Sequence, residues 1–330
     1  MQKHYFFLIS LFLYLPFVVS GQRVYALPLT VFSPAQTGLY AGNYRLESVY
    51  FTQVQTQSLK GMQSVLLLFD APLNIGRQKD WIGVGLNIAH DVSGFAGLTT
   101  TQAGVNAAYH FGLDKTQRTV LSAGCQVNYI QRNIDVTSLV FQNDLLKTNP
   151  GLDLQRLNVR NRNYIDATLG LTLRLKPTPL NTYYVGASVE HLLTPDAGFS
   201  VESLTKLARN YVVWASSETT INPFLLVSSF IHLKKLPHTT EITANITGGI
   251  RVNAAKNIVL RGGIGYQDAA IAQLIVGLDY DKVRVGLTYQ TQQLLSTTSQ
   301  LPDFLNLSIS YIGLVYRKPQ PKPLVLCPKY

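Results

Sequence analysis

Charged residues are scarce in this chain of 330 residues. Asp, Glu, Lys and Arg make up 14% of the sequence and hydrophobic residues make up 46%, whereas charged residues account for about 25% of a typical soluble domain. A chain of this length has enough residues to bury a large core. The shortage of charge therefore indicates that part of the outer surface faces something other than water.

Long apolar runs are missing as well. After the N-terminus no stretch of about 20 consecutive apolar residues occurs, and a helix needs that length to cross a bilayer. Inside a membrane the backbone N–H and C=O groups must be paired with one another, which only helices and closed barrels achieve. With spanning helices excluded, a transmembrane β-barrel remains.

Cysteine is also rare, and the basic residues form no block of like charge. Two residues, Cys125 and Cys327, give no disulfide framework, and we expect neither to form an intramolecular bridge. The net charge is +10, but the basic residues are spread along the chain. We attribute them to a solvated lumen, turns and lipid headgroups, and expect no nucleic-acid partner.

The N-terminus has the features of an export signal. Lys3 precedes an apolar run over residues 5–19, and small residues follow up to Gly21. This arrangement predicts a signal peptide over residues 1–21, cleaved near Gly21/Gln22. An uncleaved anchor is the alternative, and the small residues and the change in composition favour cleavage.

Alternation with a period of two is the dominant pattern in the rest of the chain. Residues 168–175 read Thr-Leu-Gly-Leu-Thr-Leu-Arg-Leu, and residues 282–289 follow the same pattern. Successive side chains of a strand point to opposite faces, so these runs have one apolar face. A soluble sandwich shows this pattern too, but run lengths of roughly 10 residues or more, the low charge and the tyrosines at run ends favour a membrane barrel.

About 14 such runs occur, an even number typical of single-chain bacterial barrels. They span residues 42–54, 62–73, 81–92, 98–112, 119–133, 164–176, 182–192, 207–219, 224–234, 241–253, 257–267, 271–280, 282–294 and 304–317. With the N-terminus in the periplasm, every second connection is short and rich in turn formers, and the two longest connections fall in the opposite set. We therefore predict an all-β fold, a transmembrane antiparallel β-barrel of about 14 strands over residues 42–317, in the outer membrane of a Gram-negative bacterium.

Two segments lie outside the predicted strands. Residues 22–41 are apolar, and we expect them to fold into the mouth or the lumen of the barrel as an N-terminal plug segment. Residues 318–330 contain four prolines mixed with lysines. Because proline cannot donate to a strand ladder, we expect these residues to form an extended tail in the periplasm.

Residues that commonly carry chemistry form no recognisable constellation. None of the six histidines has a metal-ligand spacing to another candidate ligand. Glycines within residues 262–265 lie inside an alternating run, where a phosphate loop does not belong. Ser188 follows Gly186 by two residues, but Glu190 stands where a nucleophile elbow needs its second glycine. A barrel lipase stays the weaker alternative, and we expect no enzymatic activity, no catalytic residue, no metal and no cofactor.

Several arginines fall on the polar faces of predicted strands. We expect them to face the lumen and to pair with Glu47, Asp166, Glu241 or Asp279. Packing a plugged lumen is the simpler role for them, and selecting an anionic solute is the alternative. These arginines are Arg45, Arg174, Arg251, Arg261 and Arg284.

Two short motifs carry a resemblance to a known family. The stretch Ser33-Pro34-Ala35-Gln36-Thr37-Gly38 is similar to the family's Asn-Pro-Ala-x-x-Gly, with Ser33 in place of Asn. The stretch His191-Leu192-Leu193-Thr194-Pro195 is similar to the His-Leu-x-x-Pro that ends a strand in the family. Over most of its mature length the chain resembles PorP/SprF outer-membrane proteins of the type IX secretion system. The Ser33 departure leaves open how the plug segment, with Ser33, Pro34, Ala35 and Gly38, docks.

The resemblance implies a barrel related to the long-chain fatty-acid transporter class. It implies a role in the export or surface attachment of one cargo protein, in secretion or gliding motility. The implied partners are that cargo, periplasmic and outer-membrane secretion-system components, and outer-membrane lipid. A transporter of hydrophobic small solutes is the alternative function. We further predict that the tail binds a periplasmic partner, with a solvated end as the alternative. The tail residues concerned are Lys322, Leu326, Cys327, Pro328 and Tyr330.

Overall fold

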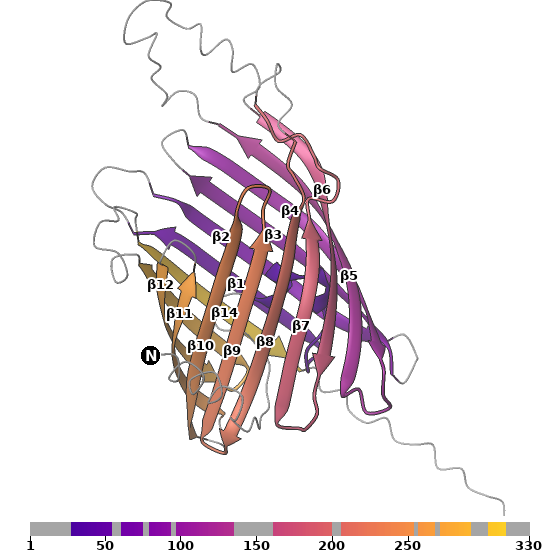
Figure 1. Ribbon diagram of the computed structural model, residues 1–330, viewed down its shortest axis with the longest axis vertical. Coiled ribbons are helices and arrows are strands. Elements are labelled where there is room, and N and C mark those ends of the chain that lie inside the picture. Colours follow the sequence, from indigo (N-terminus) through magenta and orange to yellow (C-terminus); the bar gives the residue numbers. More distant parts are fainter. Residues whose placement is uncertain are drawn as a thin grey trace, which may run out of the picture.

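Fourteen antiparallel strands form a closed barrel, in which each strand pairs with its neighbours in sequence and β1 pairs with β14 (Figure 1). The computed structural model describes residues 28–54, 61–74, 79–93, 97–134, 161–199, 206–253, 257–267, 271–291 and 303–314. The strands are β1 (Tyr44–Gln53), β2 (Gln63–Asn74), β3 (Trp81–Ser93), β4 (Leu98–Gly112), β5 (Thr119–Asn133), β6 (Asn161–Leu175), β7 (Asn181–Glu190), β8 (Asn210–Asn222), β9 (Leu225–Lys235), β10 (Thr240–Asn253), β11 (Ile258–Gln267), β12 (Ile271–Tyr280), β13 (Val283–Thr291) and β14 (Phe304–Gly313). The predicted fold class and strand count are confirmed.

The apolar face of each strand points outward. On β6, Leu169 and Leu171 are 46% and 57% exposed, while the alternating residues Gly170 and Thr172 are buried. The same alternation continues around the barrel and leaves a continuous apolar outer wall. Soluble proteins rarely expose so large an apolar surface, so this wall is suited to lipid. Among the described residues no helix is both long and apolar enough to cross a membrane.

The predicted strand limits are wrong by a few residues in places. The predicted run 207–219 is observed as β8, which begins three residues later. The preceding residues belong to a loop, because the Leu207 N–H donates to the Pro195 carbonyl and Lys206 forms an isolated bridge with Asp196. The last strand ends at Gly313, opposite the first residue of β1, Tyr44.

The two ends of the barrel differ. We call the end that carries the connections β2–β3, β4–β5, β6–β7, β8–β9, β10–β11 and β12–β13 the turn end, and the other the loop end. Short turns at the turn end use left-handed backbone at Gln117, Asn257 and Asp281. Short turns lie on the periplasmic side of outer-membrane barrels, so the turn end is the side expected to face the periplasm.

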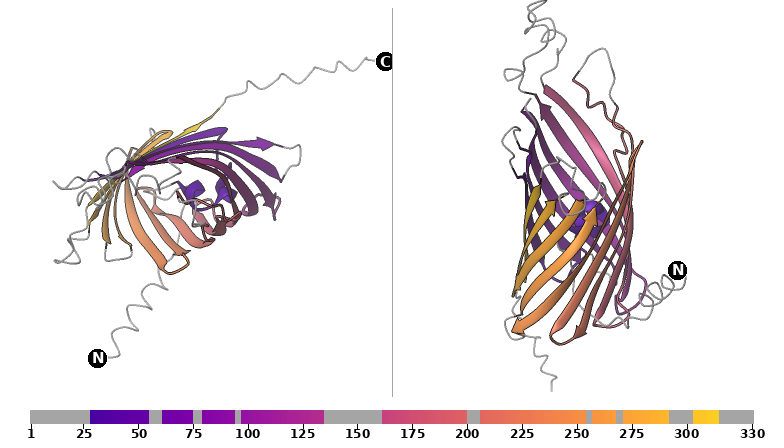
Figure 2. Two further views of the ribbon diagram at one scale, coloured as in Figure 1. Left: turned by 90° about the horizontal axis from the view of Figure 1, so that it is seen from above. Right: turned by 60° about the vertical axis from the view of Figure 1, so that its left-hand side comes forward.

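The N-terminal segment, residues 28–43, lies inside the ring of strands (Figure 2). It contains the one-turn helix α2 (Leu29–Phe32) and the 3-10 helix η1 (Pro34–Gln36). The 3-10 helix contacts β4, β5 and β6. Because the chain then enters β1 at the turn end, the segment occupies the lumen next to that end.

Candidate functional site

Local chemistry shapes the N-terminal segment before it meets the wall. Ser33 is extended and caps η1, since its Oγ accepts a hydrogen bond from the Ala35 N–H at 3.3 Å and Pro34 stands at the first helical position. Gly38 has a φ of +73°, a left-handed conformation that favours glycine. The Ser-Pro-Ala-x-x-Gly motif therefore defines the path of the backbone inside the lumen.

Three wall glycines make room for this segment. A Cβ atom added to Gly83 would lie 1.8 Å from the Thr37 carbonyl oxygen, and one on Gly124 would lie 2.5 Å from the Ala35 nitrogen. A Cβ on Gly170 would lie 2.3 Å from the Ser33 Oγ. These glycines belong to β3, β5 and β6, so the segment packs directly on the backbone of that wall.

Asp70 on β2 joins the segment to the start of the barrel. Its carboxylate accepts hydrogen bonds from the Gly38 N–H at 2.6 Å and from the Nε and Nη2 of Arg45 at 2.8 and 2.7 Å. Its backbone carbonyl accepts from the Tyr40 hydroxyl at 2.6 Å, and Arg45 lies over the Tyr40 ring. Glu47 adds a second carboxylate 3.5 Å from Arg45. Bidentate arginine pairs of this kind fix geometry strongly, and all these groups are buried.

Other hydrogen bonds attach the segment to β3, β4 and β7. The Trp81 Nε1–H donates to the Gly38 carbonyl at 3.0 Å. His110 Nε2 lies 2.8 Å from the Thr37 carbonyl, so this nitrogen carries the donated proton. The Ser188 hydroxyl donates to the Phe32 carbonyl at 2.6 Å. The carbonyl groups that the segment's short helices leave free are thus bonded to the wall.

The segment also has an apolar contact with the opposite wall. The Phe32 ring lies 4.9 Å from the Phe230 ring and 4.8 Å from the His232 ring, both on β9. Leu29 belongs to a buried cluster with Tyr184, Val212, Trp214 and Phe230 among its members. The segment therefore bridges the β2–β6 wall and the β7–β9 wall.

A second buried ionic cluster joins strands to one another. Arg261 on β11 donates to Asp279 at 3.0 Å and to Glu218 at 3.3 Å, and Arg284 donates to Asp279 at 2.7 Å. The expected pairing of Arg261 and Arg284 with Asp279 is confirmed, as is that of Arg45 with Glu47. The expectation that Asp166 pairs with an arginine is not met, because the contact of its carboxylate is with a histidine.

That histidine begins the His191–Pro195 motif at the loop end. His191 has a φ of +56°, and its Nδ1 lies 2.6 Å from the Asp166 Oδ2. The Leu192 N–H donates to the Ala167 carbonyl at 2.9 Å. Beyond the motif, Arg162 pairs with Asp196. These contacts fold the start of the β7–β8 connection back over β6 and fix the surface of the loop end.

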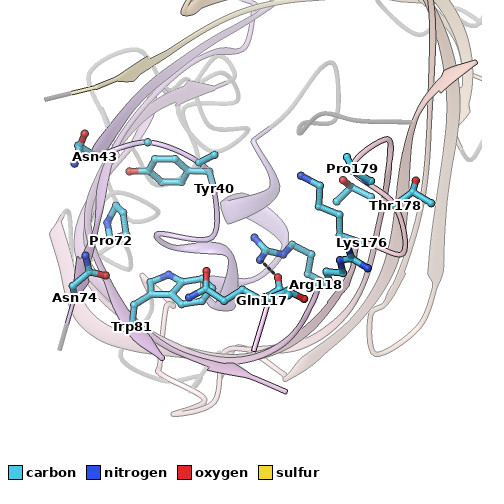
Figure 3. Close-up of a pocket in the computed structure, with 15 residues that line it drawn as sticks. Tyr40, Asn43, Pro72, Asn74, Trp81, Gln117, Arg118, Lys176, Thr178 and Pro179 are labelled. Atoms are coloured by element: carbon cyan, nitrogen blue, oxygen red, sulfur yellow. Dashed lines mark hydrogen bonds between the residues drawn. The ribbon is translucent and has the colours of Figure 1, made fainter. Parts of the chain in front are cut away.

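A pocket of about 520 Å³ opens at the turn end beside the N-terminal segment. Figure 3 shows Tyr40, Trp81, Gln117, Arg118 and Lys176 around one open space. Arg174 also lines this pocket; its Nη2 donates to the Gln117 carbonyl at 3.0 Å, and its guanidinium lies 5.8 Å from the centre of the Trp81 ring. Of the five lumen arginines predicted from the sequence, Arg45, Arg261 and Arg284 pair with carboxylates. Arg174 faces this pocket, and Arg251 donates to the Pro223 carbonyl at 3.1 Å.

The other predicted site residues are placed as follows. Ser33, Pro34 and Ala35 are buried, and Gly38 touches the backbone of Gly83. Cys125 is a free, exposed cysteine. No group of three or more metal-ligating side chains occurs within the described ranges. The tail residues lie outside the described residues, namely Lys322, Leu326, Cys327, Pro328 and Tyr330.

Sequence reasoning missed Asp70, Trp81, His110 and Ser188 as partners of the segment. Asp70 had a usable signal, because it is the one charged residue in the run 63–74. A charge in an otherwise apolar strand needs a buried partner. The other three look like ordinary lumen residues until the segment is placed.

The closed barrel, its apolar outer wall and its own N-terminal segment in the lumen define an outer-membrane β-barrel protein. Residues 25–311 match the family described as type IX secretion system membrane protein PorP/SprF, and the chain belongs to this family. The suspected family is thereby confirmed.

Solved structures with a similar fold include a hydrocarbon channel and a FadL homologue. A TodX deltaS2S3 mutant monoaromatic hydrocarbon channel has a TM-score of 0.50 at 12% identity, over 90% of this chain and 97% of that one. A Pseudomonas aeruginosa FadL homologue has a TM-score of 0.50 at 10% identity, over 90% and 99%. At such identities the likeness concerns the fold alone. No curated protein matches the sequence.

Proposed function

We propose that this chain is an outer-membrane component of the type IX secretion system that exports one specific cargo protein, attaches it to the surface, or does both, in secretion or gliding motility. Family membership supports the system. The observation that carries the proposal is the bonded N-terminal segment in the lumen, since a lumen occupied by its own chain favours docking over conduction. We expect no enzymatic activity.

The contacts of the segment support a plug role for residues 22–41. Clearing the lumen would break the hydrogen bond from the Gly38 N–H to the buried Asp70 carboxylate, and a hydrogen bond to a charged group contributes about 1.5–3 kcal/mol. It would also remove Phe32 from Phe230. We infer that Ser33, Pro34, Ala35 and Gly38 give the plug the shape that docks against the wall glycines.

The rest of the chain is divided as the sequence suggests. We propose that residues 1–21 are a signal peptide cleaved near Gly21/Gln22, that residues 42–317 form the barrel, and that residues 318–330 form a periplasmic tail. We propose that the tail binds a periplasmic component through Lys322, Leu326, Cys327, Pro328 and Tyr330. Truncation after Arg317 tests this role. Unchanged cargo export from correctly inserted truncated barrels would contradict it.

The cargo is the partner expected at the loop end. The motif around His191 fixes one wall of that end through Asp166 and Ala167. A fixed surface binds a partner with less loss of entropy than a mobile one. We propose that this surface contributes to holding the exported cargo.

The first experiment compares exported proteins with and without this gene. Surface and released proteins are quantified by mass spectrometry in the parent strain, in a deletion strain and in the deletion strain complemented by the wild-type gene. We expect one large exported protein to leave the surface in the deletion strain alone, while other exported proteins stay unchanged. An unchanged exported set would overturn the proposal for this chain.

Transport of hydrophobic small solutes is the second candidate. The apolar cluster of Tyr184, Val212, Trp214 and Phe230, which packs with Leu29 of the N-terminal segment, favours it, because these side chains would line the lumen once the segment moved aside. Uptake of a hydrophobic probe into proteoliposomes measures this activity. Uptake equal to that of empty liposomes would exclude the candidate.

A further inference from the structure

The turn-end pocket has an excess of positive charge. Arg118, Arg174 and Lys176 line it, and no carboxylate residue does. In the part of the chain that the structure describes, none of these three side chains takes part in a salt bridge. Their arrangement places three cations around one space of about 520 Å³ at the periplasmic mouth.

The nearby carboxylate of Asp114 accepts hydrogen bonds within its own turn, the β4–β5 connection. It accepts hydrogen bonds from the Thr116 hydroxyl at 2.8 Å and from the Arg118 N–H at 2.7 Å. Desolvation acts to raise the pKa of Asp114, but these hydrogen bonds and one from the Thr119 N–H outweigh it, so the pKa lies below its usual value. Asp114 is therefore ionised at neutral pH. The buried Asp80 carboxylate, next to Trp81 in the chain, accepts hydrogen bonds from the Tyr109 hydroxyl at 3.0 Å and from the Gly112 N–H at 3.2 Å. These two carboxylates do not balance three cations.

Polar atoms of the pocket lack partners. The Nε of Arg174 and the hydroxyls of Thr178 and Thr182 are buried and make no hydrogen bond, and all three residues line the pocket. A buried donor without a partner is unfavourable by about 1–3 kcal/mol. A ligand with acceptor oxygens removes this deficit.

We propose that this pocket binds carboxylate groups of an acidic peptide segment presented by a periplasmic protein. Arginine pairs with carboxylates through two parallel hydrogen bonds, and the Trp81 and Tyr40 rings offer apolar contact to the rest of a peptide. The pocket lies within the mouth, beside the N-terminal segment and between the turns, so it faces away from the lipid-contacting wall (Figure 3).

The chain's own tail is a poor occupant. Residues 315–330 contain four basic residues and no acidic one, so their charge repels the pocket. An external acidic peptide is attracted both by the pocket and by the tail that follows β14. The identity of the peptide as part of a periplasmic secretion component rests on the proposed function.

Binding of a labelled hexaglutamate peptide with blocked ends to the purified, detergent-solubilised full chain tests the proposal. We expect saturable binding that weakens about ten-fold in the double variant Arg174→Gln/Lys176→Gln, because two charge-assisted hydrogen bonds are lost. Lys115→Gln is the matched control, since Lys115 lies on the same turn as Arg118 but does not line the pocket; it should change affinity less than about two-fold. Electrophoretic migration of each variant on a gel, compared between unheated and heated samples, confirms that each barrel is folded. If the double variant does not fold, Lys176→Gln alone should weaken binding by about three-fold.

Four results overturn the proposal. The first is equal affinity of the folded pocket variant and the wild type for hexaglutamate, and the second is binding of hexaglutamine as tight as that of hexaglutamate. The third is displacement of the peptide by inorganic phosphate at the same concentration. The fourth is a large gain in affinity for the peptide after truncation at Arg317. The third assigns the pocket to phosphate and the fourth to the tail itself. If the deletion strain exports the same proteins as the parent strain and the peptide binds as expected, the proposed function is overturned. The assignment of the pocket as a carboxylate site then still holds.

Discussion

Two clusters of buried charge lie on the inner wall, and they differ in what they join. Around Arg45, Asp70 links β1 and β2 and also accepts the Gly38 N–H of the N-terminal segment. Around Arg261, hydrogen bonds run from β11 to β8, β9 and β12. The first cluster therefore couples the β1–β2 pair to the position of the segment, whereas the second strengthens the wall. Substitutions in the two clusters should separate these effects.

Loss of the Asp70 charge should have the largest effect. Asp70→Asn leaves the buried Arg45 with Glu47, 3.5 Å away, as its remaining carboxylate partner, and should lower the free energy of unfolding by about 3–5 kcal/mol. It should also weaken the hydrogen bond that the Gly38 N–H donates to this side chain, and thereby expose residues 28–43 to protease. Urea unfolding in detergent and limited proteolysis measure the two effects. Asp114→Asn, in an exposed turn, is the control, and full protease protection of the segment in folded Asp70→Asn barrels would contradict the coupling.

Loss of Arg261 should weaken the wall and leave the segment in place. Arg261→Met leaves Asp279 and Glu218 with Arg284 as a remaining partner, so we expect destabilisation of about 2–3 kcal/mol, less than for a fully broken pair. The same urea and proteolysis measurements apply. Release of residues 28–43 in this variant would show that the two clusters are not separable.

The strands were predictable from the sequence because their signal is local. Alternation within a run such as 168–175 predicts both the strand and the face of it that contacts lipid. Docking of the segment was not predictable, because its partners are distant in sequence. Gly38 and Asp70 are 32 residues apart, Thr37 and His110 are 73 apart, and Phe32 and Ser188 are 156 apart. Such pairs follow from barrel closure, which fixes register only when all strands are in place.

The lining of the turn-end pocket was likewise only partly predictable from the sequence. Arg174 was assigned to the polar face of its strand by alternation, and that face is confirmed by its place in the pocket. Lys176 is the last residue of the predicted run 164–176 and lies two residues after Arg174, so alternation places these two on the same face. Arg118 lies in the β4–β5 turn, outside every predicted run, so periodicity had no means of adding it to the group.

Substitution of a wall glycine tests whether the N-terminal segment packs directly on the backbone of the wall. Gly83→Ala adds a methyl group 1.8 Å from the Thr37 carbonyl, so the segment must move, with an expected loss of about 1–3 kcal/mol. Gly262→Ala is the matched control, because a Cβ there meets nothing within 4 Å. The measurement is protease protection of residues 28–43 together with urea unfolding. Equal protection in the two variants would mean that Gly83 is not a docking surface.

The smallest expected effect lies within the segment itself and concerns two buried hydroxyls. Ser33→Ala removes the hydroxyl that caps η1 through the Ala35 N–H at 3.3 Å, and a long bond on a short helix should contribute about 0.5–1 kcal/mol. Thr30→Val removes a buried hydroxyl that has no hydrogen-bond partner, so it should leave stability unchanged or raise it slightly. Rates of cleavage within residues 28–43 distinguish the two variants. Faster cleavage of Thr30→Val than of Ser33→Ala would mean that burial of the segment, and not its cap, sets its shape.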